Sequence, residues 1–168
     1  WFPLSCAFGC HRETTSIVML SAEIIAIGSE LLTPSFIDTN SIYLTEQLNS
    51  IGIPVVMKSI VGDDENYLDH AIRASLDRTP ILITIGGLGP TEDDVTRKVV
   101  ARVLQRQLVL NDEVLAKLEA RFRSRGIEMP PNNARQALVL TGAEILENHH
   151  GTAPGLWISS EKNHIILL

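Results

Sequence analysis

Three short aliphatic runs, each followed by a segment with helical periodicity, constrain the fold of this 168-residue chain more than any other feature. The runs are AEIIAIG at 22–28, IPVVMKSIVG at 53–62 and PILITIG at 80–86. Each run has the length of a strand and ends in glycine. Strands that alternate with helices form βαβ units, so the sequence predicts an α/β fold with a mostly parallel sheet. Helices would cover both faces, giving three α/β/α layers.

Four segments carry apolar residues three or four positions apart, which is typical of amphipathic helices. The apolar sets are Leu44, Leu48 and Ile51; Leu68, Ile72 and Leu76; Val95, Val99 and Val103; and Leu115, Leu118 and Phe122. Gly52 and Gly126 would end the first and last of these helices. The remainder predicts a short helix at 133–137 and strands near 143–146 and 164–168.

Composition excludes some classes of partner. The formal net charge is −6, with acids and bases interspersed, and there is no basic stripe of the kind that binds nucleic acid. No apolar run approaches the roughly 20 residues that span a bilayer. We therefore expect a cytoplasmic protein that binds neither nucleic acid nor membrane, although a local loop could still bind a small anion.

Residues 1–20 show no period and carry both cysteines, Cys6 and Cys10. A lone C-x-x-x-C pair is a weak metal or redox signal, so we expect this segment to be a disordered extension with two free thiols. The predicted domain covers 21–168. The sequence stops inside the apolar run HIILL, which predicts a domain truncated at its C-terminal end.

Gly86, Gly87 and Gly89 lie where the third strand gives way to a helix. Glycines let the backbone approach a ligand closely, and a helix N-terminus offers free N–H groups that favour phosphate. The spacing matches neither a Walker A motif nor a complete G-x-G-x-x-G motif. A structural interpretation competes: Thr91 would cap the helix and Asp94 would be its third residue, as in a capping box.

Three acids follow these glycines, Glu92, Asp93 and Asp94. They would repel an anion unless a divalent cation bridged the two, and Mg²⁺ commonly binds between carboxylates and phosphates. A functional version of the loop therefore needs a metal. Asp93 and Asp94 are its candidate ligands.

Further candidates occupy other turns. Gly28, Ser29 and Glu30 follow the first strand and would open on the same edge of the sheet, although Glu30 could equally be a solvated turn residue. Asn40 could hydrogen-bond a ligand, but its stretch DTNS at 38–41 reads first as a helix cap. The stretch PPNN at 130–133 reads most simply as a stop and a cap, and GTAPG at 151–155 as a turn.

Together these stretches resemble the N-terminal domain of the competence/damage-inducible protein A (CinA) family, within the molybdopterin-binding MoaB/Mog group. The matching motifs are EIIAIGSELL, DTNSIYLTEQLNSIGI, VGDDENYL, TIGGLGPTEDDVTRKVVA, PNNARQALVL and GTAPGLW. The resemblance covers about residues 22–168. It implies a MoaB/Mog-like three-layer fold with a cleft between the glycine loop and the loop after the first strand.

The resemblance also implies an activity, the metal-dependent hydrolysis of ADP-ribose to AMP and ribose 5-phosphate with Mg²⁺, Mn²⁺ or Co²⁺. The catalytic residues would be Asp93, Asp94 and Glu30. The phosphate- or ligand-binding residues would be Gly28, Ser29, Asn40, Gly86, Gly87, Leu88, Gly89, Thr91, Asn133, Gly151 and Thr152.

Two alternatives stay open. One is a module that binds molybdopterin or another phosphorylated ligand without turnover, and the other is a homo-oligomeric partner of a nicotinamide-nucleotide amidase domain, which this sequence lacks.

Two departures from the family pattern bear on the cleft. Thr33-Pro34-Ser35 replaces the usual Leu-Gly-Gln, and the expected Pro-Gly-Pro-Pro loop would fall beyond Leu168.

Overall fold

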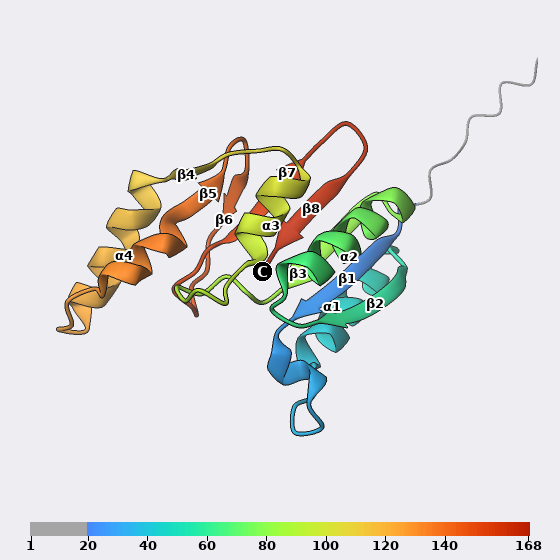
Figure 1. Ribbon diagram of the computed structural model, residues 1–168, viewed down its shortest axis with the longest axis horizontal. Coiled ribbons are helices and arrows are strands. Elements are labelled where there is room, and N and C mark those ends of the chain that lie inside the picture. Colours follow the sequence, from blue (N-terminus) through green and yellow to red (C-terminus); the bar gives the residue numbers. More distant parts are fainter. Residues whose placement is uncertain (1–19) are drawn as a thin grey trace, which may run out of the picture.

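The computed structural model describes residues 20–168 (Figure 1). The extension predicted for 1–20, with Cys6 and Cys10, lies outside the described residues except for Leu20. None of the helices in the described part is long and apolar enough to cross a membrane.

One six-stranded sheet forms the centre, in the order β2-β1-β3-β8-β7-β6. Its strands are β1 (Ala22–Ile27), β2 (Val55–Val61), β3 (Ile81–Ile85), β6 (Glu144–Leu146), β7 (Gly155–Ser159) and β8 (His164–Leu167). The first four in spatial order are parallel, whereas β7 and β6 are antiparallel. The sheet is therefore mostly parallel, as predicted, with an antiparallel extension on one side.

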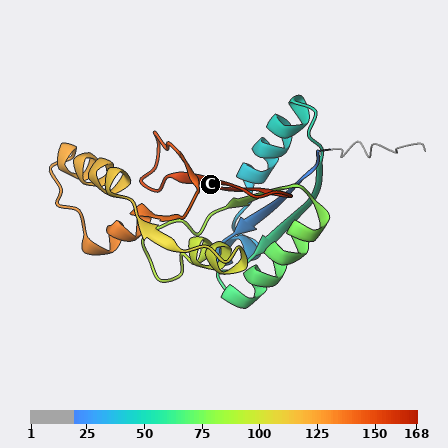
Figure 2. The ribbon, with the colours of Figure 1, turned by 90° about the horizontal axis from the view of Figure 1, so that it is seen from above.

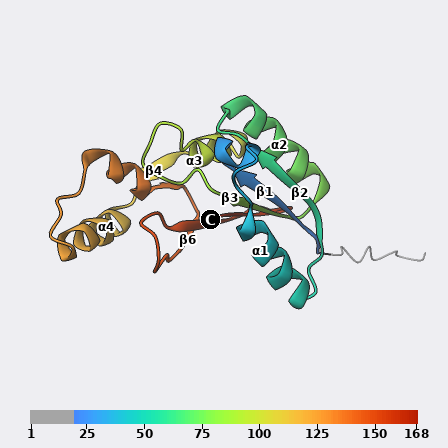
Figure 3. The ribbon, with the colours of Figure 1, turned by 90° about the horizontal axis from the view of Figure 1, so that it is seen from below.

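Helices cover both faces of the parallel half (Figures 2 and 3). Helix α1 (Thr39–Ser50) lies on one face, and α2 (Glu65–Arg78) and α3 (Thr96–Val103) lie on the other. Alternating residues of β1 point to the two faces: Ile24 packs with the α1 side, whereas Ile25 and Ile27 join the core beneath α2 and α3. The three-layer α/β/α prediction is confirmed.

A second group of elements stands at the far end of the molecule from α1 and α2 (Figures 1 and 2). It contains β4 (Leu108–Leu110), α4 (Asp112–Ser124), the 3₁₀ helix η2 (Pro131–Ala137) and β5 (Leu138–Leu140). Strands β4 and β5 pair antiparallel. Val139 and Leu140 belong to the main core, so this group is continuous with the sheet.

Several predicted boundaries were wrong. Ile51 is not part of the first helical face: α1 ends before it, and its side chain is 70% exposed. Helix α3 begins at Thr96 rather than near Glu92, because the preceding residues form a turn. No pattern in the sequence predicted β4, β5 or β7. The first two have only three residues each, too few to show a period.

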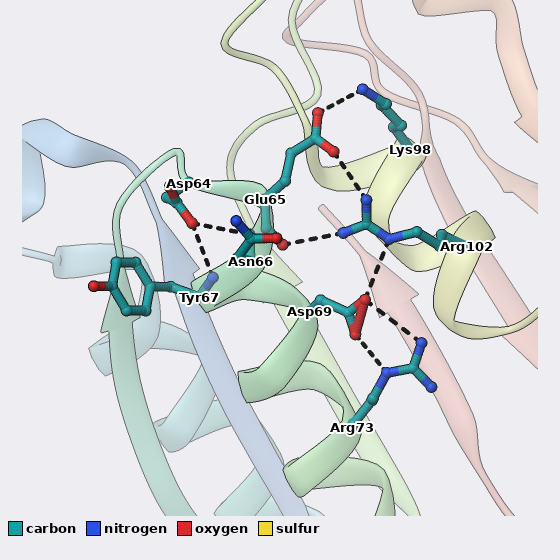
Figure 4. A network of polar contacts seen from close by, with 8 residues as sticks. All are labelled: Asp64, Glu65, Asn66, Tyr67, Asp69, Arg73, Lys98 and Arg102. Atoms are coloured by element: carbon teal, nitrogen blue, oxygen red, sulfur yellow. Dashed lines mark hydrogen bonds and ion pairs between the residues drawn. The ribbon is translucent and has the colours of Figure 1, made fainter.

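A polar network joins α2 to α3 on the surface (Figure 4). Glu65 accepts from Lys98 at 2.5 Å and from Arg102 at 3.0 Å, while Arg102 also reaches Asp69 at 3.2 Å. These ion pairs hold the two helices that cover the same face.

Candidate functional site

The candidate site lies at the carboxyl edge of the parallel strands, where the loops after β1, β2 and β3 meet. The Ser29 N–H donates to the Asp63 carboxylate at 2.8 Å, and the Asp63 N–H donates to the Ser29 hydroxyl at 3.1 Å. This reciprocal pair ties the first loop to the second. A Cβ on Gly86 would overlap the Ile27 carbonyl oxygen, so the third loop passes directly against the end of β1.

The glycines of the third loop are required by the packing of the chain itself. Gly86 and Gly87 have φ of 102° and 66°, in the left-handed region that favours glycine. A Cβ on Gly87 would overlap the Thr96 hydroxyl, and one on Gly89 would come within 2.5 Å of the Asp94 carboxylate. The glycines thus let the turn close onto the start of α3. The close approaches that these glycines allow are to other atoms of the protein, and a ligand is not needed to explain them.

Asp94 holds this turn together from the inside. Its Oδ1 accepts from the Gly89 N–H at 2.8 Å, and its Oδ2 accepts from the Thr91 N–H at 2.7 Å and the Thr91 hydroxyl at 2.6 Å. Burial pushes the pKa of Asp94 upward, but these hydrogen bonds and the charge of Arg97 outweigh it and leave the pKa below its ordinary value. Asp94 is therefore an ionised residue at neutral pH.

The predicted capping box at Thr91 and Asp94 is wrong in its location. Thr91 is not a helix cap and Asp94 is not a helical residue, because α3 begins two residues later, at Thr96. Val95 occupies the cap position and offers no side-chain acceptor. The same pair of side chains instead closes the turn before the helix.

The first turn of α3 faces the glycine turn. The Thr96 hydroxyl donates to the Gly86 carbonyl at 2.8 Å, and its N–H lies 3.3 Å from the Gly87 carbonyl. Across residues 20–168, no hydrogen bond is found for the N–H groups of Gly87 and Leu88. These two donors, beside the positive end of a helix, could bind an anion. The Leu88 side chain is in the core, so it can contribute only its backbone.

Arg97 is the buried cation of the site. Its side chain is 5% exposed, and Nη2 donates to the Gly89 carbonyl at 3.0 Å. Asp94 therefore accepts from the N–H of Gly89 while Arg97 donates to its carbonyl, so the two side chains hold this residue from both sides. Burial is the main reason that the pKa of Arg97 falls to about 10; the charge of Asp94 opposes this change, and the charge of Arg135 adds to it.

The exposed acids are placed differently. Asp93 is exposed at the surface of the turn, whereas Glu92 pairs with Arg135 of η2 at 2.6 Å. The Glu30 carboxylate lies over Gly28, where a Cβ would meet Oε1 at 2.6 Å. No group of three or more metal-ligating side chains occurs among residues 20–168.

The donor chemistry of this edge fits a cation held by one or two carboxylates and completed by substrate phosphates and water, which is the usual Mg²⁺ arrangement. It does not form a closed cage. Asp93 is exposed and free of the hydrogen bonds that engage its neighbour, whereas Asp94 already accepts three. Of the acids in this turn, Asp93 is therefore the one whose carboxylate could serve as a metal ligand without breaking hydrogen bonds of the described chain.

Other predicted ligand residues are dispersed. Asn40 is exposed in the first turn of α1, which is capped by Asp38 as the sequence predicted. Asn133 is not a helix cap: it lies inside η2, and its amide donates to Gln136 at 3.3 Å. Within the described residues, the side-chain link between the turn and η2 is the Glu92–Arg135 ion pair.

Gly151 and Thr152 line a separate cavity of about 410 Å³ between α4 and the β6–β7 loop. The Arg121 guanidinium donates to the Gly151 and His150 carbonyls and fixes this loop. The cavity lining contains none of the residues of the glycine turn. The structure thus divides the predicted site residues between the sheet edge and this cavity.

Sequence reasoning missed two residues of the site. Asp63 follows the second strand by two residues, so its position at a parallel strand end was an available signal. Arg97 carried no signal, because an arginine one residue into a helix looks like a solvated side chain. Its burial follows from the tertiary position of the turn.

The mostly parallel sheet with helices on both faces defines an α/β protein with a MoaB/Mog-like fold. The Mog protein from Mycobacterium ulcerans superposes with a TM-score of 0.56 at 19% identity, over 89% of this chain and 82% of that chain. At that identity the likeness concerns the fold alone. The protein CinA with unknown function from Thermoplasma acidophilum superposes with a TM-score of 0.79 at 28% identity, over 88% of this chain and 86% of that chain.

The chain belongs to the MoCF_biosynth family, described as "Probable molybdopterin binding domain", whose profile matches residues 23–168. It is the CinA-type form of this domain. A CinA-like protein from Solibacter usitatus is 54% identical over 149 residues, and one from Koribacter versatilis is 51% identical over 142 residues. These stretches are 89% and 84% of this chain but only 36% and 34% of the relatives. The chain therefore spans about a third of their length.

Proposed function

We propose that this domain hydrolyses a nucleotide pyrophosphate such as ADP-ribose, with a divalent cation, to AMP and ribose 5-phosphate. The observation that supports this most directly is the meeting of the loops after β1, β2 and β3 at one sheet edge, where Ser29 is tied to Asp63 and the glycine turn passes against the end of β1. The substrate class is the one that the resemblance of the sequence to the CinA family implies. The N–H groups of Gly87 and Leu88 would bind a phosphoryl oxygen, next to the helix end.

The chain's own groups would divide the work. Asp94 shapes the turn and keeps the two N–H donors in place, while exposed Asp93 is free to hold a cation. Glu30 and Asp63 are candidates to accept a proton from the attacking water, because both follow strands that end at this edge. When bound, the cation would neutralise phosphate charge and help to generate hydroxide from water.

The test is AMP release from ADP-ribose with Mg²⁺, Mn²⁺ or Co²⁺, against the same mixture with EDTA. It should be run on this chain and on a longer chain of the relatives' full length. Asp93→Asn should lower the rate at limiting metal and recover partly as metal is raised. Glu92→Gln, an exposed acid in the same turn, is the matched control and should leave the rate within about twofold. Absence of metal-dependent AMP release from both chains would refute the proposal.

A second candidate is binding of a phosphorylated pterin without turnover, which the MoaB/Mog class of the fold favours. Calorimetry with pterin phosphate and with ADP-ribose would separate the two. Binding of the pterin alone, with no AMP formed from ADP-ribose, would favour the binding module.

A further inference from the structure

Arg97 has an unusual environment for an arginine. Among the described residues, only two buried side-chain polar atoms lack a hydrogen-bond partner, Nη1 of Arg97 and the hydroxyl of Thr84. A buried charged donor without an acceptor is costly, and folded proteins rarely retain one without a reason. The Thr84 hydroxyl is a weaker case, because it is neutral.

The unpaired nitrogen lies beside the glycine turn. Nη2 of the same guanidinium donates to the Gly89 carbonyl at 3.0 Å, so Nη1, bonded to the same carbon, lies next to this peptide. The open N–H groups of Gly87 and Leu88 belong to the same short turn. Three donors without acceptors in the described chain therefore gather at the start of α3, where the helix dipole also favours an anion.

The local charges leave room for an anion. Asp94 faces Arg97, but its oxygens are already engaged by Gly89 and Thr91. Arg135 adds a second positive charge near Arg97, and its own ion pair is with Glu92, a side chain that is 92% exposed. The buried part of the turn thus has a cation whose neighbouring carboxylate is occupied by other donors.

We propose that Arg97 is an anion-binding residue of this site, and that its Nη1 takes an oxygen of a phosphoryl group held at the glycine turn. Asp94 keeps the guanidinium oriented through the Gly89 peptide. Solvent does not reach Nη1, so the anion gains access by displacing part of the exposed 91–93 turn. The inference rests on the proposed function for the substrate class, but it concerns binding alone.

The test measures binding of inorganic phosphate by calorimetry, both with and without Mg²⁺; because inorganic phosphate is not hydrolysed, the result does not depend on turnover. Arg97→Met should weaken phosphate binding at least about tenfold, and Arg97→Lys, which keeps the charge but loses the planar fork, should recover part of the affinity. Arg102→Met removes a charge from the same helix, away from the turn, and should change affinity less than about twofold. Equal phosphate affinity in folded Arg97→Met and wild type would overturn the proposal.

A second measurement applies to the wild-type chain and does not require any variant to fold. Phosphate should change amide hydrogen exchange at residues 86–93 and leave the α4 cavity unaffected. No phosphate binding either with or without Mg²⁺, or no change in exchange at the turn when phosphate binds, would also overturn the proposal. Phosphate binding that depends on Arg97, together with no hydrolysis of ADP-ribose, would refute the proposed activity and leave this inference standing.

Discussion

Gly89 and Asp94 fit against each other with no spare room: Oδ1 of Asp94 lies 2.8 Å from the Gly89 nitrogen, and a methyl group on Gly89 would stand 2.5 Å from Oδ2. The φ of Gly89 is not in the left-handed region. The position therefore requires glycine for space rather than for backbone freedom.

Gly89→Ala should lower the free energy of unfolding by about 2 kcal/mol, the usual cost of forcing a side chain into a packed site. In a double-mutant cycle with Asp94→Ala the two losses should not add, because the new methyl group enters the space of the removed carboxylate. Urea denaturation gives the free energy of unfolding of the wild type, the two single variants and the double variant. Additive losses would contradict the steric explanation.

Gly52→Ala is the matched control. Gly52 has φ of 81°, and a Cβ placed on it would meet no described atom within 4 Å, so the substitution should cost about 1–2 kcal/mol through backbone strain alone. It lies away from the sheet edge and should leave phosphate binding unchanged, whereas Gly89→Ala should weaken it.

Asp94 and Asp93 should separate stability from function. Asp94→Ala removes three hydrogen bonds to a charged, half-buried acceptor and should cost about 2 kcal/mol. Asp93→Ala, at an exposed position, should cost less than about 0.5 kcal/mol. Thermal or urea unfolding checks both, and a larger loss from Asp93 would show that it has a structural role.

The lowered pKa of Asp94 also predicts a pH dependence. Its contribution to stability is fully present above the ordinary carboxyl value of 3.8 and is lost as the pH falls through the lower value of the folded protein. Acid unfolding of Asp94→Asn should therefore show a shallower decline below about pH 4 than wild type. If the stability of both proteins fell equally with pH, the lowered pKa assigned to Asp94 would be contradicted.

Glu23 and Arg78 should respond unequally to truncation. Glu23 is 2% exposed on β1 and accepts from Arg78 at 2.8 and 2.7 Å and from Ser75 at 2.6 Å. Arg78→Ala leaves a carboxylate buried without its counter-ion and should cost about 3–5 kcal/mol. Glu23→Ala leaves an arginine that can turn to solvent, and should cost about 1–3 kcal/mol. Chemical denaturation of both variants shows which substitution lowers the free energy of unfolding more.

Arg97→Met tests the stability side of the inference. Removing a buried charge relieves its desolvation cost, which offsets the lost hydrogen bond to Gly89. The variant should therefore lie within about 1 kcal/mol of wild type in urea unfolding, while its phosphate affinity falls. A loss of several kcal/mol would instead indicate a structural arginine.

The architecture of the parallel half could be predicted because β1, β2 and β3 are aliphatic runs separated by clear helical patterns. The β4–β5 pair could not, because each strand has three residues and is specified by a partner far along the chain. In the site, strand ends located Ser29, Glu30 and the glycines. The predicted helix-capping role of Asp94 was wrong, since local capping patterns cannot tell a turn from the first turn of a helix.

The interlocking of Ser29 with Asp63, across 34 positions of sequence, affects how the site comes into being during folding. No single segment can form this edge early, because each loop is held by a neighbour that arrives only when the parallel strands pair. Closing such non-local contacts is slow. A ligand that binds the finished edge would therefore stabilise the whole sheet. That protection should extend to amides of β1 and β2 that never touch the ligand.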